Sequence, residues 1–169
     1  RQAKKEKAPL LYNLAKLQQE MGRRYSFSPD KTLQIAQALY EKHKVMSYPR
    51  TDSQYLSMDV YGEIAQHLES CRFGNFAPMV DKLNLTALEA DKSYFNDLKV
   101  TDHHALIPTI NPDMRSIYDI LSADERKVFD AVVLSVIAIF YPEYQYDATK
   151  IIVDISGNLF KSTGTVIRD

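Results

Sequence analysis

Apolar residues near the start of the chain recur at helical spacings. Leu10, Leu14, Leu17 and Met21 follow one another at intervals of three or four, which places them on one face of a helix from about residue 11 to residue 21. Gly22 is expected to end this helix. A helix with one apolar face predicts a core against which that face packs.

A second helix begins with a clear start signal. Ser28 is a favourable N-cap, and Pro29 suits the first helical position, where no backbone amide is needed. This helix should end near His43, because residues 44–48 form a short extended segment and Pro49 disfavours helix in the residue before it. The residues expected on its buried side are Leu33, Ala36, Leu39 and Tyr40.

The middle of the chain contains a third helix and then a stretch with little periodicity. Ser57 caps a helix that should reach about Ser70. From residue 72 to residue 103, glycine, proline and asparagine favour loops, with a short helix expected around Leu88.

The last helix and the strands that follow it have distinct patterns. Ser122 and Glu125 have capping-box spacing, and the apolar run 128–140 predicts a helix buried on most sides. From Tyr144 apolar and polar residues alternate, with a turn at 156–158, which predicts a β-hairpin. The expected fold class is therefore mainly α with a small β-component (α+β). Because a lone hairpin is marginally stable, we expect these strands to belong to a larger sheet and the chain to be a fragment.

Charge and composition restrict the classes of partner. The 21 Lys and Arg residues nearly balance the 22 Asp and Glu residues, so any contact with nucleic acid must be local. No apolar run approaches the roughly 20 residues that a membrane helix needs, and a cytoplasmic location is the default expectation. Cys71 is the only cysteine, which gives neither an internal disulfide nor a metal site.

The segment Ser47-Tyr48-Pro49-Arg50-Thr51-Asp52-Ser53 places reactive groups where a short strand runs into a loop. A phenolate can attack a phosphodiester, and the resulting phosphotyrosine conserves the bond energy for resealing. The guanidinium of Arg50 can hold two phosphate oxygens, and Asp52 could orient it. Ser53 could contact phosphate or cap a turn. Considered alone, Tyr48 is also compatible with a half-buried strand tyrosine that has only a packing role.

A second candidate is the segment Thr101-Asp102-His103-His104-Ala105-Leu106-Ile107-Pro108-Thr109. Adjacent side chains point apart in a strand, so the two histidines are poor joint ligands for one metal ion. One of them could serve as a phosphate-binding cation or a proton donor. A surface or packing role is the alternative.

Four segments, in order along the chain, resemble the type IA DNA topoisomerases, and the proline after Tyr48 resembles the topoisomerase III branch. The segment 47–53 resembles the family's nucleophile motif, and 102–109 resembles its histidine segment. Residues 9–22, with Pro9-Leu10, Leu14, Leu17-Gln18 and Gly22, resemble the entry into the cleavage domain, and 32–41 resembles the helix before the nucleophile. The resemblance covers about residues 9–110; the final hairpin only resembles strands of the gate arch.

This resemblance implies roles for individual residues. Tyr48 would attack single-stranded DNA and form a link to the 5′ phosphate, while Arg50 and His103 would hold or polarise the scissile phosphate. His104 matches the second histidine of the topoisomerase III form. Supporting and DNA-contacting positions would be Gln18, Thr51, Asp52 and Ser53.

The resemblance also implies an organisation into domains. Residues 1–10 would be a strand or linker of the gate domain, 11–140 a helical, winged-helix or CAP-like cleavage domain, and 141–169 a hairpin returning to the gate. The family's Asp-x-Asp pattern is absent from the chain. No metal site is therefore expected in this chain. Mg²⁺ is expected for the longer parent enzyme with its remaining domains, so the fragment alone is expected to be inactive.

The alternative from another class is a non-catalytic, winged-helix-like DNA-binding module, in which residues 30–40 would be a recognition helix. This interpretation requires exposed basic and amide side chains on this helix. It does not explain why Tyr48, Arg50 and His103 would lie together. The topoisomerase reading requires these three residues to line one groove.

Overall fold

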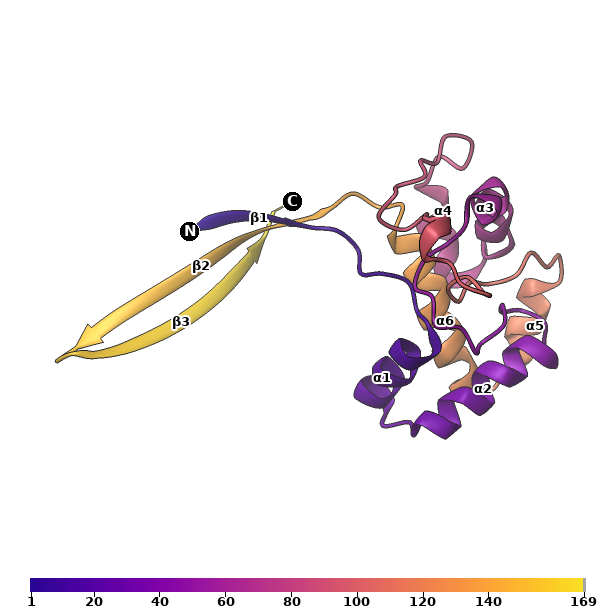
Figure 1. Cartoon of the computed structure of the whole chain (residues 1–169), viewed down its shortest axis with the longest axis horizontal. Coiled ribbons are helices and arrows are strands. Elements are labelled where there is room, and N and C mark those ends of the chain that lie inside the picture. The colour runs from indigo at the N-terminus through magenta and orange to yellow at the C-terminus, as the bar shows by residue number, and fades with distance from the viewer. Residues whose placement is uncertain (169) are drawn as a thin grey trace. The chain divides into compact units, whose positions relative to one another are not determined.

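The computed structural model describes residues 1–168, which fold into two compact units (Figure 1). A helical unit comprises residues 9–140, and a sheet unit combines residues 1–8 with 141–168. Helices make up most of the described structure, and a three-stranded antiparallel sheet makes up the rest. The predicted class, mainly α with a small β-component, is confirmed.

Helix α1 extends from Leu14 to Tyr25 and starts and ends later than the spacing predicted. It starts later because the side chain of Asn13 caps it, accepting a hydrogen bond from the Lys16 amide at 2.8 Å. It runs through Gly22 and closes at Ser26, whose φ of 56° lets its amide donate to the Gly22 carbonyl. The expected stop at Gly22 was therefore wrong, since one glycine costs a helix only about 1 kcal/mol and this turn buries Met21.

Helices α2 (Pro29–Glu41) and α3 (Met58–Ser70) confirm their predicted starts. The hydroxyl of Ser28 accepts from the Lys31 amide at 3.1 Å, and that of Ser57 accepts from the Val60 amide at 3.2 Å. Ala36 and Leu39 are buried as expected. Tyr40 was expected on the buried side of α2, but 37% of it is exposed.

The region between α3 and the last helix contains short elements. These are the 3-10 helices η1 (Gly74–Phe76) and η2 (Asp97–Lys99) and the helices α4 (Ala77–Asp81) and α5 (Met114–Ile120). The helix expected around Leu88 was wrong. Asn84 instead accepts bonds from the amide and hydroxyl of Thr86, and these local bonds compete with helical ones.

Helix α6 (Ala123–Ala138) runs through the middle of the helical unit (Figure 1). The predicted capping box is present, with both Ser122 and Glu125 making their reciprocal bonds. The predicted burial is also confirmed, with Val128, Val132 and Val136 fully buried. No helix among residues 1–168 is long and apolar enough to cross a membrane.

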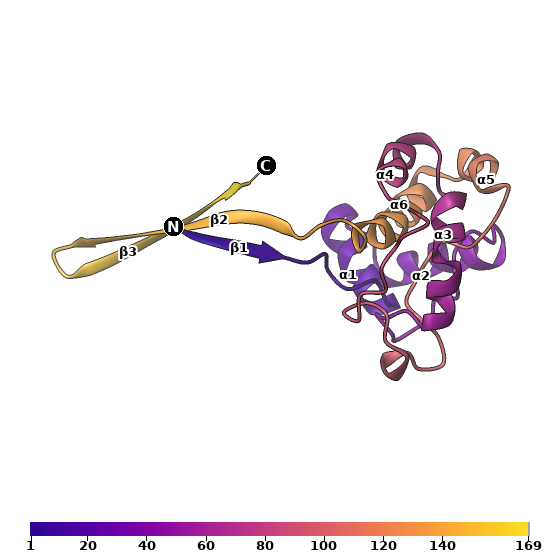
Figure 2. The same cartoon turned by 90° about the horizontal axis from the view of Figure 1, so that it is seen from above.

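The sheet unit contains β1 (Gln2–Glu6), β2 (Tyr144–Ile155) and β3 (Asn158–Ile167) in the order β1-β2-β3, all antiparallel. The predicted hairpin is β2 and β3, joined by Ser156 and Gly157, which both have positive φ as a tight hairpin turn requires. Strand β1 lies along β2 (Figure 2), with Lys4 opposite Tyr146.

Candidate active site

The chain between α2 and Tyr48 makes one sharp turn. Lys44 adopts the left-handed conformation, with φ of 56°, which is uncommon for a residue with a side chain. Its carbonyl accepts a hydrogen bond of 2.7 Å from the Thr109 hydroxyl and a longer one from the Asn111 side chain. The turn therefore depends on a segment more than sixty residues further along the chain.

After this turn, the extended segment 45–47, which leads to Tyr48, pairs with the histidine segment 102–109. The Ser47 amide donates to the Ile107 carbonyl at 2.9 Å, and the Ile107 amide donates to the Ser47 hydroxyl at 3.0 Å. The Thr109 amide donates to the Val45 carbonyl, and Met46 and Pro108 form an isolated antiparallel bridge. The two segments singled out from the sequence thus lie side by side.

Two rings flank the phenol ring of Tyr48. The His103 imidazole lies at 4.5 Å between ring centroids, with the planes tilted by 42°. The ring of Tyr40 makes an edge contact at 5.4 Å. Tyr48 is half-buried and His103 is exposed, so the pair is open to solvent on one side. A phenol, a neighbouring imidazole and open access are what a phosphate-attacking site needs.

Arg50 follows the half-buried tyrosine on an exposed stretch. Pro49 is buried and anchors the chain, while the Arg50 side chain is exposed and forms no ion pair with any residue from 1 to 168. Asp52 was expected to orient Arg50, yet no bond joins them in this range. The Asp52 backbone carbonyl instead accepts from the Asn13 side chain at 3.0 Å, which ties the loop to the start of α1.

Thr51 and Ser53 hold the loop from inside. They are 3% and 4% exposed. The Thr51 hydroxyl donates to the His103 carbonyl at 3.2 Å and accepts from the Ser53 amide. The Ser53 hydroxyl donates to the Lys99 carbonyl at 3.0 Å. Because both hydroxyls bond to backbone groups, they position Tyr48 relative to His103; their contact with DNA stays a prediction.

Gln18 and His104 are bonded away from the Tyr48 ring. The Gln18 side-chain amide donates to the Pro29 carbonyl at 3.1 Å and so connects α1 to α2. His104 Nδ1 lies 2.7 Å from the Ala105 carbonyl. Their predicted roles in DNA contact stay predictions.

Three positioning residues had not been singled out as functional. Tyr40 borders Tyr48, Lys44 forms the turn, and His67 on α3 places its Nδ1 2.7 Å from the Pro108 carbonyl. Burial lowers the pKa of His67, the nearby His104 adds to this effect, and the bond to Pro108 opposes it. An aromatic residue eight positions before Tyr48 was the one available signal, and it was assigned to the core instead.

A groove lies beside the residues that border Tyr48. It has a volume of about 460 Å³ and is lined by Tyr40, Glu41, Lys44, Met46, Ser47 and Thr109. Its lining combines an aromatic ring, a cation and two hydroxyl-bearing side chains, which are groups that nucleotides contact, with the carboxylate of Glu41.

The sequence matches the family described as DNA topoisomerase over residues 1–169. The chain belongs to the DNA topoisomerase family. It is 39% identical over 166 residues to DNA topoisomerase 3 of Bacillus subtilis (strain 168), covering 98% of this chain and 22% of that protein. DNA topoisomerase 3 of Bacillus cereus (strain ZK / E33L) is 36% identical over 167 residues, covering 97% of this chain and 22% of that protein. These relatives confirm the predicted topoisomerase III-like resemblance.

A solved structure agrees with the family match. Full-length topoisomerase I from Thermotoga maritima superposes with a TM-score of 0.61 at 25% sequence identity, covering 99% of this chain and 26% of that chain. The chain thus spans about a quarter or less of the length of each topoisomerase that it matches.

Proposed function

We propose that this chain supplies the nucleophile of an ATP-independent type IA topoisomerase that cleaves, passes and reseals single-stranded DNA. The observation that supports this most is the 4.5 Å contact between the Tyr48 and His103 rings, made by two segments far apart in the sequence. The family match supports the reaction class.

The proposed reaction exchanges one phosphate ester for another. The Tyr48 oxygen attacks the phosphorus, a bond forms between them, and the bond from phosphorus to the 3′ oxygen breaks. The phenol loses its proton and the departing 3′ oxygen gains one, so the products are a 5′-phosphotyrosine and a 3′ hydroxyl. Resealing is the reverse step and needs no external energy, since the number of phosphate ester bonds is unchanged.

His103 and Arg50 have complementary tasks in this proposal. His103, in ring contact with Tyr48, holds the scissile phosphate or moves a proton beside the phenol. Arg50 is exposed and without an acidic partner among the described residues, so its guanidinium is available to a phosphate. The charge that develops on the phosphate is stabilised by the guanidinium of Arg50.

Magnesium belongs to the proposal only for the longer parent. Within residues 1–168 no three His, Cys, Asp or Glu side chains gather to hold an ion, so the residues present do not fit a metal centre. No step is therefore assigned to a metal here. We propose that further topoisomerase domains supply the metal site and the grip on the free 3′ end. The proposed location is the cytoplasm, and the nucleoid if the source is a bacterium.

The non-catalytic DNA-binding module is less well supported by α2. Lys31 pairs with Asp124 at 2.7 Å, and the Gln37 side chain donates to Glu41 at 2.7 Å. Two of the few polar side chains that a recognition helix would offer are thus bonded within the protein.

The proposal is tested by trapping the covalent adduct. The 169 residues would replace the matching segment of Bacillus subtilis DNA topoisomerase 3, and the chimera would be incubated with magnesium and a labelled single-stranded oligonucleotide. We expect mass spectrometry to find the nucleotide on Tyr48, and Tyr48→Phe to abolish the adduct. Tyr55→Phe is the matched control and should retain it. Binding of DNA without an adduct, in a chimera that folds, would contradict the proposal.

A second experiment tests the division of labour between domains. The 169-residue chain alone, with magnesium and supercoiled DNA, should neither relax nor nick it. Relaxation by the isolated chain would overturn the assignment of the metal site to other domains.

A further inference from the structure

One face of the sheet unit carries three lysines whose charges no acidic partner neutralises. Lys4 on β1, Lys150 on β2 and Lys161 on β3 are exposed, and none of them forms an ion pair with any residue from 1 to 168. In the sequence these lysines lie in separate segments. The strand pairing brings them together.

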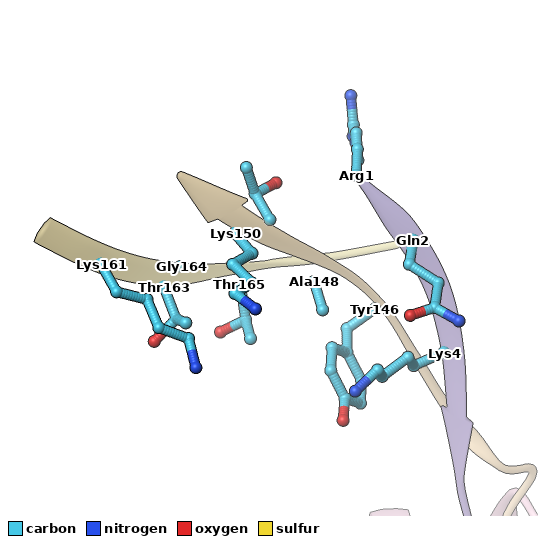
Figure 3. Close-up of a pocket in the computed structure, with 11 residues that line it drawn as sticks. Arg1, Gln2, Lys4, Tyr146, Ala148, Lys150, Lys161, Thr163, Gly164 and Thr165 are labelled. Atoms are coloured by element: carbon cyan, nitrogen blue, oxygen red, sulfur yellow. The ribbon is translucent and has the colours of Figure 1, made fainter. Parts of the chain in front are cut away.

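The register places the lysines on the same side of the sheet. Lys4 lies opposite Tyr146, Lys150 opposite Thr163, and Lys161 opposite Ile152. Residues 146, 150 and 152 have the same parity along β2, so their side chains share one face. Figure 3 shows Tyr146, Lys161, Thr163 and Thr165 directed to one side of the ribbon and Arg1 directed to the other.

The same face also carries aromatic and hydroxyl groups. The rings of Tyr144 and Tyr146 lie 5.4 Å apart on this side, and 48% of Tyr144 is exposed. A shallow groove of about 440 Å³ runs between the strands here, bordered by Lys4, Tyr146, Lys150, Lys161, Thr163 and Thr165 among others. The acidic residues of matching parity, Glu6 and Asp154, lie at the two ends of this face.

The opposite face differs in its charged groups, because it carries the buried carboxylate of Asp147. Asp147 is bonded there by Arg1 and Arg168, both at 2.6 Å, so its carboxylate offsets one of the two guanidinium charges. Exposed apolar side chains lie on both faces: Ile151, Val153 and Phe160 on this one, and Ile152, Leu159 and Ile167 on the lysine face. Three lysines without an ion pair among residues 1–168 thus share the lysine face, whereas the opposite face of the described strands carries one, Lys5, which lies opposite Gln145.

We infer that this lysine face, defined by Lys4, Tyr146, Lys150 and Lys161, is a second binding surface for single-stranded DNA, separate from the groove beside Tyr48. Lys4 and Lys150 are about 13 Å apart along the strands, from four residues at about 3.3 Å each, so they reach different phosphates of one backbone. The two tyrosine rings offer flat surfaces on which bases stack, which favours a single strand over a duplex whose bases are already stacked. The inference does not depend on the cleavage chemistry proposed for Tyr48.

Fluorescence anisotropy of the 169-residue chain with a labelled oligothymidylate of about 20 nucleotides tests this surface. The combined variant Lys4→Gln/Lys150→Gln/Lys161→Gln should bind roughly tenfold more weakly at about 0.1 M salt. The slope of log binding constant against log salt concentration should also become smaller in magnitude by about 2, because each of the three lost phosphate contacts contributes about 0.7. The matched control, Lys16→Gln/Lys82→Gln/Lys92→Gln, removes the same charge from exposed positions of the helical unit. It should leave both quantities unchanged.

The variant Tyr146→Leu separates stacking from charge. It should weaken binding of the single strand and leave the salt slope as it was, while binding of a duplex of the same length stays weaker than that of the single strand. Equal losses in the lysine and control variants, or the absence of saturable binding at low salt, would overturn the inference. Equal affinity for duplex and single strand, with no effect of Tyr146→Leu, would overturn its assignment to single strands. These binding measurements contain no magnesium and require no cleavage, so their outcomes are distinct from failure of the proposed reaction.

Discussion

The position of Tyr48 depends on contacts made by individual side chains. Its ring packs between Tyr40 and His103, and the backbone around it is held by the buried hydroxyls of Thr51 and Ser53. A buried hydroxyl left without a partner costs about 1 to 3 kcal/mol, so these bonds define the loop strongly. The reactive groups stay accessible, while the groups that position them are buried.

Tyr40 should act as a positioning residue. Tyr40→Leu removes the edge contact at 5.4 Å, and the Tyr48 ring gains freedom, so adduct formation in the chimera should slow by roughly tenfold. Tyr40→Phe keeps the ring and should restore the rate. The rate of adduct formation at saturating oligonucleotide is the measurement. If Tyr40 had only a structural role, its substitution would change thermal stability and not this rate. Equal rates in Tyr40→Leu and Tyr40→Phe would exclude the positioning role.

At the scale of elements, the histidine segment joins three parts of the helical unit. It pairs with the extended segment before Tyr48, supports the Lys44 turn through Thr109, and is bonded to α3 through His67. Because the bond from His67 reaches a carbonyl oxygen, its Nδ1 carries the proton and the ring can be neutral. The geometry around Tyr48 thus depends on α3, an element with no proposed contact to DNA.

The His67 bond predicts a pH dependence of stability. Burial lowers the pKa of His67 in the folded state below its ordinary 6.5, so the unfolded chain binds its proton first as pH falls. The contribution of neutral His67 is therefore complete above about pH 6.5 and is lost progressively below it. Urea unfolding between about pH 7.5 and pH 5.5 should show a smaller loss of stability for His67→Gln than for the unaltered chain. Parallel pH profiles would contradict this assignment.

At the scale of the whole molecule, the two units are stabilised by different means. The helical unit has a buried core around α6 and the apolar faces of α1, α2 and α3. In the sheet unit, β2 and β3 are exposed along most of their length. There, Asp147 is 3% exposed and bonded to Arg1 and Arg168, so it connects both ends of the described chain. The bond to Arg168, followed by that to Arg1, lowers the pKa of Asp147.

Asp147→Asn should therefore loosen one unit selectively. The variant loses the charge that holds both arginines, so amides of 144–167 should exchange hydrogen faster while those of α6 keep their protection, as measured by mass spectrometry. The unaltered chain should behave in the same way when pH falls through the lowered pKa of Asp147, because its stabilisation is present above the ordinary carboxyl range and lost on protonation. Faster exchange in α6 as well would show that the two units unfold together.

The sequence by itself determined the features that depend on near neighbours. Helix caps and hairpin turns form between residues a few positions apart, so they can be predicted from the sequence. This holds for the caps at Ser28, Ser57 and Ser122 and for the turn at 156–157. The segment 47–53 could likewise be recognised because its residues are contiguous.

Only the tertiary structure decided what lies beside Tyr48 and which strand completes the sheet. The ring contacts with His103 and Tyr40, the Lys44 turn and the pairing of β1 with β2 join residues that no local pattern relates. Helical periodicity predicted that Tyr40 is buried, and this was wrong. The pattern gives the average direction of a helix face, and it does not show which neighbour packs against the edge of that face. The lysine face could not be predicted from the sequence either. Its lysines come from three strands, and they lie on one side only after those strands pair.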